Sequence, residues 1–134
     1  MITYLWVAIG GALGSVARFG VGNYASQWHG GGFPWGTLIV NVTGSFVIGL
    51  FAALTGPGGR WAVSLDARQF VMVGICGGYT TFSSFSLQTL DLARDGHLAG
   101  AGANVVGSVV ACLVAVWLGY LAAMALGQAF AGKA

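Results

Sequence analysis

The chain has 134 residues, of which 57% are hydrophobic and only 6% are charged. Globular domains carry about 25% charged residues, so this composition indicates a membrane protein with a single domain, residues 1–134, rather than a soluble domain. The net charge of +2 gives no reason to expect nucleic acid as a partner.

Four apolar segments are long enough to cross a lipid bilayer, which takes about 20 residues per helix. They are residues 3–24, 35–54, 70–90 and 100–126, and the stretches between them contain glycine, proline or charged residues. We therefore expect an all-α fold of four transmembrane helices. No Lys or Arg precedes the first apolar stretch, which predicts a mature span rather than a signal peptide.

The basic residues are nearly balanced across the membrane. Four spans place both ends of the chain on one side with Arg60, Arg68 and Lys133, while Arg18 and Arg94 lie on the other. Three residues against two is too weak a bias to fix one orientation. Insertion in both orientations would permit an antiparallel two-fold dimer, and a bundle of only four helices favours an oligomer.

The first span carries two glycines one helical turn apart, Gly10 and Gly14. Small residues at this spacing let the backbone of a neighbouring helix approach closely in lipid. We predict that this face of the first span packs against another helix.

The second span places Asn41 and Thr43 at membrane depth, within the sequence GTLIVNVTGSF. A polar side chain inside the membrane is costly enough to be a functional hypothesis by itself. Amide and hydroxyl groups can donate hydrogen bonds that replace the water around an anion. This lining is better suited to conduction than to covalent chemistry.

The third span contains two adjacent glycines, Gly77 and Gly78, followed by Thr80 and Thr81. Each glycine weakens a helix by about 1 kcal/mol relative to alanine, so we expect a broken helix at this point. Either threonine could cap the second half of the helix. The carbonyl groups freed by a break would suit a small cation, and in an antiparallel dimer the two breaks would meet near the symmetry axis.

Beyond the glycines, polar and aromatic side chains separate onto two faces. Thr81, Ser84 and Gln88 share one helical face, and Phe82 and Phe85 lie on the adjoining face. An anion could touch the hydroxyls while it passes the positive edges of the rings. Alternatively, the hydroxyls bond to their own helix and the rings pack against lipid or a neighbour. Spacing alone leaves both interpretations open.

The fourth span has a small residue at every fourth position, an extended stripe that lets the backbone of another helix approach closely. These residues are Ala103, Gly107, Ala111, Ala115, Gly119, Ala123 and Gly127. Asn104 and Ser108 add polar groups one turn apart.

The residues needed for catalysis or proton coupling are missing from the four segments. The three acidic residues, Asp66, Asp91 and Asp95, lie outside them. This argues against a small multidrug exporter, which needs a carboxylate in the membrane. No Ser/His/Asp or Cys/His arrangement is present, so we do not expect an enzyme. Cys76 and Cys112 lie in apolar runs, which is typical of packing residues.

Three motifs resemble those of the Fluc or CrcB family of small dual-topology fluoride channels: GGALGSVARF at 10–19, GTLIVNVTGSF at 36–46 and GGYTTFSSFS at 77–86. The resemblance extends over nearly the whole chain. It implies an antiparallel homodimer in the bacterial inner membrane, with two narrow fluoride pores and a structural Na⁺ at the dimer centre. It also implies passive export of fluoride from the cytoplasm. A structural subunit of a larger complex would give no reason for polar side chains at membrane depth.

The same resemblance assigns roles residue by residue. Asn41 would line the pore, Phe82 and Phe85 would be the rings of the fluoride pathway, and Thr81, Ser84 and Ser108 would belong to its polar lining. The carbonyl groups of Gly77 and Thr80 would hold the sodium ion. Arg18 matches an arginine for which we favour a role in the vestibule over snorkelling to the membrane surface.

The chain departs from the family pattern at four positions. Ser15 and Phe19 replace the usual alanine and tyrosine near Arg18. Gln88 stands where relatives often have Glu, and Asn104 stands where some have a tyrosine facing the pore. The last substitution weakens the argument for a role of the fourth span.

Overall fold

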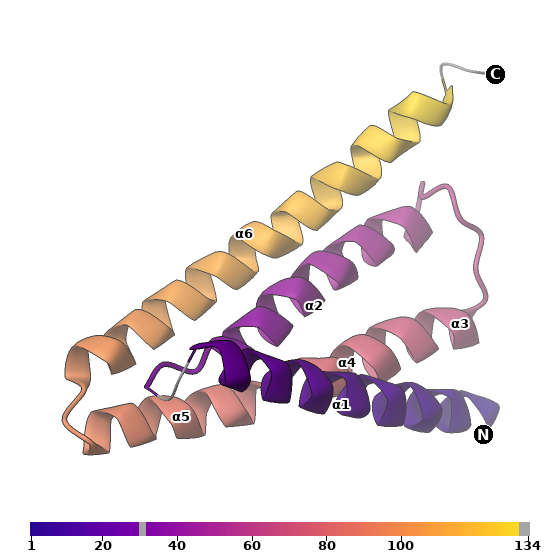
Figure 1. The fold of residues 1–134 in the computed structure, drawn as a ribbon. Coiled ribbons are helices and arrows are strands. Elements are labelled where there is room, and N and C mark those ends of the chain that lie inside the picture. Colours follow the sequence, from indigo (N-terminus) through magenta and orange to yellow (C-terminus); the bar gives the residue numbers. More distant parts are fainter. Residues whose placement is uncertain (30–31, 132–134) are drawn as a thin grey trace.

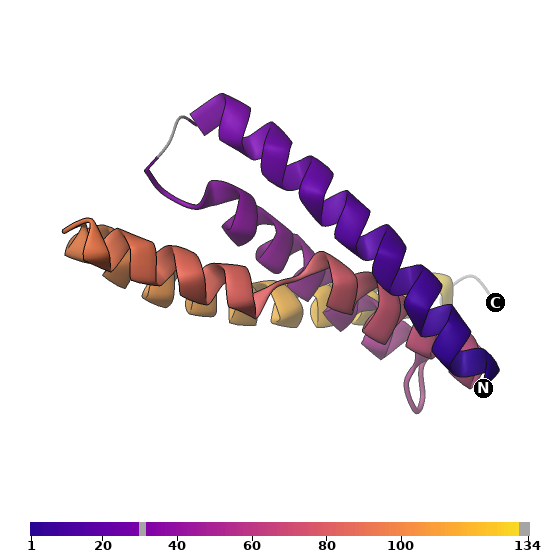
Figure 2. The same cartoon turned by 90° about the horizontal axis from the view of Figure 1, so that it is seen from below.

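The computed structural model describes residues 1–29 and 32–131, and these residues form a bundle of four long helical spans (Figure 1). The spans are α1 (Ile2–His29), α2 (Trp35–Thr55), a composite third span and α6 (Leu98–Ala131). Each contains a stretch that is long and apolar enough to cross a membrane, which confirms the predicted all-α architecture. Helix α1 begins and α6 ends at the same end of the bundle (Figures 1 and 2). Lys133, which we expected at that end, lies outside the described residues.

The third span is a chain of four helical segments. It consists of α3 (Leu65–Gln69), a π-helical segment η1 (Phe70–Cys76), α4 (Gly77–Tyr79) and α5 (Phe82–Arg94). It begins five residues before the predicted boundary because Ser64 caps α3, accepting a hydrogen bond of 3.2 Å from the Ala67 N–H. A π-helix is wider than an α-helix and is common at functional sites, and nothing in the sequence predicted it.

The break in the third span lies at Thr80 and Thr81, whose backbones are extended (Figure 2). The predicted break is therefore confirmed, but its placement at the glycines is wrong. Gly77 keeps helical angles, with φ −65° and ψ −38°, and Gly78 lies inside α4. Thr81 caps α5 as predicted, its hydroxyl accepting from the Ser84 N–H at 3.2 Å.

The glycines of the third span instead allow close contact with α1. A Cβ atom added at Gly78 would lie 2.9 Å from the Cα of Gly11, and one added at Gly74 would lie 2.9 Å from the Cα of Gly10. A Cβ added at Gly14 would collide with the carbonyl oxygen of Ile75. The two helix backbones therefore touch directly, which confirms the predicted packing face of α1.

The small residues of α6 pack against α2 only in the second half of the helix. Ala115, Gly119 and Ala123 are buried, and a Cβ at Gly119 would collide with the carbonyl oxygen of Phe46. Gly107 is exposed and has open space around it. The predicted close packing is thus confirmed for the second half of the stripe, and within the described chain no helix approaches Gly107. Positions four residues apart rotate about 40° per step around an α-helix, so the stripe turns away from α2.

Candidate functional site

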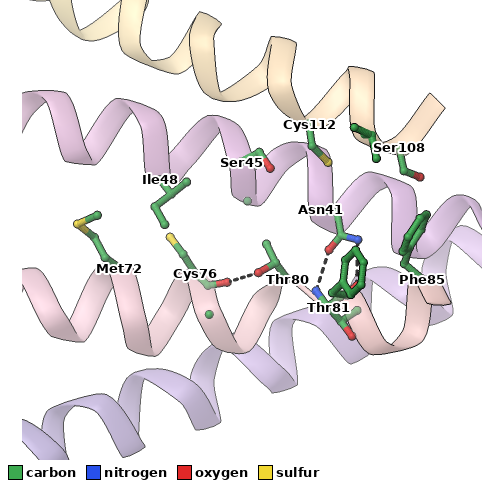
Figure 3. A pocket seen from close by; sticks show the side chains of 14 residues that line it. Asn41, Ser45, Ile48, Met72, Cys76, Thr80, Thr81, Phe85, Ser108 and Cys112 are labelled. Carbon is green, nitrogen blue, oxygen red and sulfur yellow. Dashed lines mark hydrogen bonds between the residues drawn. The ribbon is translucent and has the colours of Figure 1, made fainter. Parts of the chain in front are cut away.

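Asn41 of α2 holds the two halves of the broken span together. Its amide oxygen accepts from the Thr81 N–H at 2.7 Å, and its amide nitrogen donates to the Thr81 carbonyl at 3.1 Å (Figure 3). A backbone group left unpaired in lipid costs several kcal/mol, and a helix break exposes such groups. The side chain of Asn41 therefore supplies the partner of the Thr81 N–H and adds a second donor to the Thr81 carbonyl, which α5 already uses. The sequence pointed to Asn41 but gave no sign of this partner.

Helix α1 supports the break from another side. The Arg18 Nη1 donates to the Thr80 carbonyl at 3.3 Å, and the Ser15 hydroxyl lies 3.5 Å from the Gly78 carbonyl. Arg18 is half-buried, and this hydrogen bond directs its guanidinium at the break rather than only at the membrane surface. Both contacts neutralise carbonyl groups that the end of α4 leaves without helical partners.

A first cavity of about 330 Å³ lies between α2, the third span and α6 (Figure 3). We call it the ring cavity because both predicted rings line it, and their centroids are 5.2 Å apart. Phe85 is buried, whereas Phe82 is 77% exposed, so the described chain covers only one of the two rings. The polar residues that line the ring cavity are Asn41, Ser45, Thr80, Thr81 and Ser108.

A second cavity of about 320 Å³ lies between α1, α2 and α5. We call it the arginine cavity, since Arg18 is the one charged residue among the described residues that line it. Its other polar walls are Ser15, Thr37, Thr81, Ser84 and Gln88. The predicted polar face of α5 therefore faces this cavity. Thr81 lines both cavities, so the two meet at the break.

Gln88 contributes an unusual group to this region. Its Oε1 atom is shielded from solvent and has no hydrogen-bond partner within the described structure. A buried acceptor without a partner is destabilising by about 1–3 kcal/mol. Because Gln88 lines the arginine cavity, a water molecule there could supply the missing donor.

The hydroxyl groups of the third span differ in their hydrogen-bond partners. Thr80 and Ser86 bond back to the carbonyl groups four residues earlier, both at 2.9 Å, as the structural interpretation expects. Thr81 instead donates to the Ser84 hydroxyl at 3.1 Å. The proton of Ser84 is then free to be donated into the arginine cavity.

Helix α6 contributes a buried polar pair. Asn104 and Ser108 are 1% and 6% exposed, and the Ser108 hydroxyl donates to the Asn104 amide oxygen at 3.2 Å. The Asn104 amide nitrogen donates to the Thr89 hydroxyl of α5 at 2.8 Å. The sequence analysis did not predict a role for Thr89. Its position four residues after Phe85, and therefore on the same helical face, could have indicated one.

The end of α4 offers carbonyl oxygens that could hold a cation. The Thr81 N–H, which would bond to the Gly77 carbonyl in a continuous helix, bonds to Asn41 instead. Gly77 is exposed at the wall of the ring cavity, and the Thr80 carbonyl already accepts from Arg18. Neutral carbonyl oxygens are ligands for hard cations, so the Gly77 carbonyl fits the predicted donor set, whereas the Thr80 carbonyl is shared with a guanidinium group of the same sign of charge as the cation.

Comparison with known proteins places this arrangement in a family. A family model described as CrcB-like protein, Camphor Resistance (CrcB), matches residues 5–120. A protein of Opitutus terrae named fluoride-specific ion channel FluC is 62% identical over 96% of this chain and 97% of its own length. Proteins of the same name from Methylocella silvestris and Rhodospirillum rubrum are both 58% identical, over 93% and 95% of this chain and 95% and 98% of their own lengths. These relatives are named as channels and not as enzymes, in agreement with the prediction that the chain is not an enzyme.

Proposed function

The chain belongs to the CrcB family, and from that premise we propose that it forms a fluoride-selective channel. The choice of ion rests on one observation. A relative named fluoride-specific ion channel is 62% identical to this protein over 96% of the chain. The predicted multi-pass membrane location agrees with the four spans. The geometry of the break supports a conduction pathway that passes through both cavities.

Fluoride is small and tightly hydrated, so a pore must offer donors that replace its water with little rearrangement. Arg18 supplies a positive charge that draws anions into the arginine cavity. Ser84 and Thr81 then offer hydroxyl groups, and the second N–H of the Asn41 amide remains free for an anion in the ring cavity. Chloride is larger and would be excluded by the width of the path.

The rings of Phe82 and Phe85 would pass fluoride along their edges. An aromatic ring has a positive edge and a negative face. The two ring planes are inclined at 45°, so they do not present two parallel negative faces to the cavity.

We place a second, antiparallel copy of the chain against the exposed side of the ring cavity. Phe82 is 77% exposed in one subunit, so its cavity wall is incomplete without a partner. The Gly77 and Thr80 carbonyls would hold a structural sodium ion near the two-fold axis. When bound, this ion would neutralise the partial negative charge of carbonyl groups at the end of α4.

The direction of transport follows from acid chemistry. Hydrogen fluoride is a weak acid that enters cells from acidic surroundings and dissociates in the cytoplasm. Neither cavity is lined by a carboxylate that could couple transport to protons. Fluoride would therefore leave passively, down its electrochemical gradient.

Flux from liposomes tests this function directly. Purified protein is reconstituted with internal fluoride or chloride, and ion-selective electrodes follow each anion after a counter-ion ionophore is added. We expect rapid fluoride efflux and chloride efflux near the level of empty liposomes. An absence of fluoride efflux, or chloride efflux of equal size, would overturn the proposal.

Replacing the rings tests the pathway residue by residue. We expect Phe82→Ile and Phe85→Ile each to lower fluoride efflux by about tenfold, which corresponds to about 1.4 kcal/mol. Isoleucine keeps the apolar surface but has no positive ring edge. Phe51→Ile is the matched control, because Phe51 lies in α2 and lines neither cavity. Equal losses in all three variants would count against a pathway along the rings.

A further inference from the structure

Three hydrogen bonds run in one direction from the ring cavity into α5. Ser108 donates to the Asn104 oxygen, the Asn104 nitrogen donates to Thr89, and the Thr89 hydroxyl donates to the Phe85 carbonyl at 2.7 Å. We call these groups the Asn104 relay. Asn104 is 1% exposed, so its amide must find its partners inside the protein.

The direction of the relay decides what Ser108 presents to the ring cavity. A serine hydroxyl has one proton and two lone pairs. Because that proton is donated to Asn104, the oxygen of Ser108 can offer the cavity only lone pairs. A group that presents lone pairs repels an anion, so this arrangement fits an empty or hydrated cavity.

A half-turn of the Asn104 amide would reverse the whole relay. Thr89 would then donate to the amide oxygen, and the amide nitrogen would donate to Ser108. Asn104 keeps two partners in either arrangement. The Phe85 carbonyl loses only its second donor, since the α-helix already supplies the N–H of Thr89. The reversed relay frees the Ser108 proton to be donated into the ring cavity.

We propose that Asn104 is a positioning residue that sets Ser108 as an acceptor when the ring cavity holds no anion and as a donor when it does. This inference rests on the proposed function, which puts fluoride in the ring cavity. A hydrogen bond to an ionised acceptor is about twice as strong as a neutral one, so the anion favours the reversed relay. The amide of Asn104 can both accept and donate, whereas an aspartate at this position could only accept and a leucine could do neither.

A double-mutant cycle tests whether Asn104 acts through Ser108. In Asn104→Leu, Ser108 is expected to bond back to its own helix, as Ser86 does. We expect the fluoride concentration that half-saturates efflux to rise about tenfold, equivalent to the loss of one good hydrogen bond. Combining this change with Ser108→Ala should add nothing to the effect of Ser108→Ala alone. Additive effects would mean that Asn104 serves only packing, and would overturn the inference.

The control is Thr3→Val, which removes a hydrogen bond of 2.5 Å to Asp66 between α1 and α3. It lies outside both cavities and should leave half-saturation unchanged. Wild-type protein without fluoride efflux would refute the proposed function and the relay together. Wild-type efflux with an additive cycle would refute the relay alone.

A spectroscopic measurement covers the case in which Asn104→Leu does not fold. The chain has three asparagines, Asn23, Asn41 and Asn104, so ¹⁵N-asparagine labelling gives three side-chain NH₂ signals. Asn23→Gln and Asn41→Gln assign two of the signals and leave the third to Asn104. We expect fluoride to shift this signal in the wild type and not in Ser108→Ala. A signal that fluoride leaves in place, at concentrations that saturate efflux, would overturn the inference.

Discussion

Asn41→Leu is expected to reduce fluoride efflux by at least about a hundredfold, which corresponds to about 2.7 kcal/mol. Leucine has nearly the same size but can neither accept from the Thr81 N–H nor donate to its carbonyl. Thr81 is only 8% exposed, so its backbone is largely shielded from bulk water. The Thr81 carbonyl keeps the Phe85 N–H of α5 as a donor, but the Thr81 N–H is left without a partner, which costs about 1–3 kcal/mol. The two halves of the third span should then shift, and both cavities that meet at Thr81 should change shape.

Asn41→Asp separates two roles of this side chain: holding the break through Thr81, and donating a hydrogen bond to an anion in the ring cavity. Aspartate still accepts from the Thr81 N–H, so the break should be held better than in Asn41→Leu. Its carboxylate would nevertheless repel an anion in the ring cavity, and efflux should remain low. Thermal unfolding in detergent, followed by loss of helical circular dichroism, should rank the wild type above Asn41→Asp and Asn41→Asp above Asn41→Leu.

Ser86→Ala is the control for these variants, because Ser86 is exposed, bonds to its own helix and lines neither cavity. It should keep both efflux and the unfolding temperature of the wild type. If Asn41→Leu also kept both, the hydrogen bonds to Thr81 would not be what holds the break.

Composition was sufficient to predict the four spans, since a helix of about 20 apolar residues crosses the bilayer and satisfies its own backbone in lipid. The existence of a break in the third span could also be predicted, but its position could not. Glycine propensity pointed to Gly77 and Gly78, whereas contact with α1 holds Gly78 in a helix. A tertiary contact therefore overrode local propensity. The cap at Thr81 was read correctly because capping depends on neighbours in sequence.

The partners of the polar residues could not be predicted, because they come from distant parts of the chain. Asn41 lies 40 residues before Thr81, and Arg18 lies 62 residues before Thr80. Helical periodicity places residues on a face but does not say which helix lies opposite. For the same reason, the periodicity of α5 found Ser84 and Gln88 on one face but could not show that this face and the rings line separate cavities.

Gly14→Ala is expected to destabilise the protein, although alanine is the better helix former. The new Cβ would collide with the Ile75 carbonyl oxygen and lie 2.8 Å from the Tyr79 nitrogen. Both are backbone atoms, so no side chain can rotate away and α1 must move as a whole. Overpacking of this kind costs about 1–3 kcal/mol, and here it also pulls Arg18 away from the break.

Gly11→Ala provides the matched control, because a Cβ at Gly11 meets nothing within 4 Å. The two glycines lie on the same helix, so both substitutions gain about 1 kcal/mol of helix propensity. We expect Gly11→Ala to keep or raise the unfolding temperature and to leave efflux unchanged, while Gly14→Ala lowers both. The contrast isolates backbone contact as the function of Gly14, because propensity favours alanine at both positions. Equal unfolding temperatures for the two variants would mean that α1 and the third span can separate without loss of stability, and that their contact does not support the break.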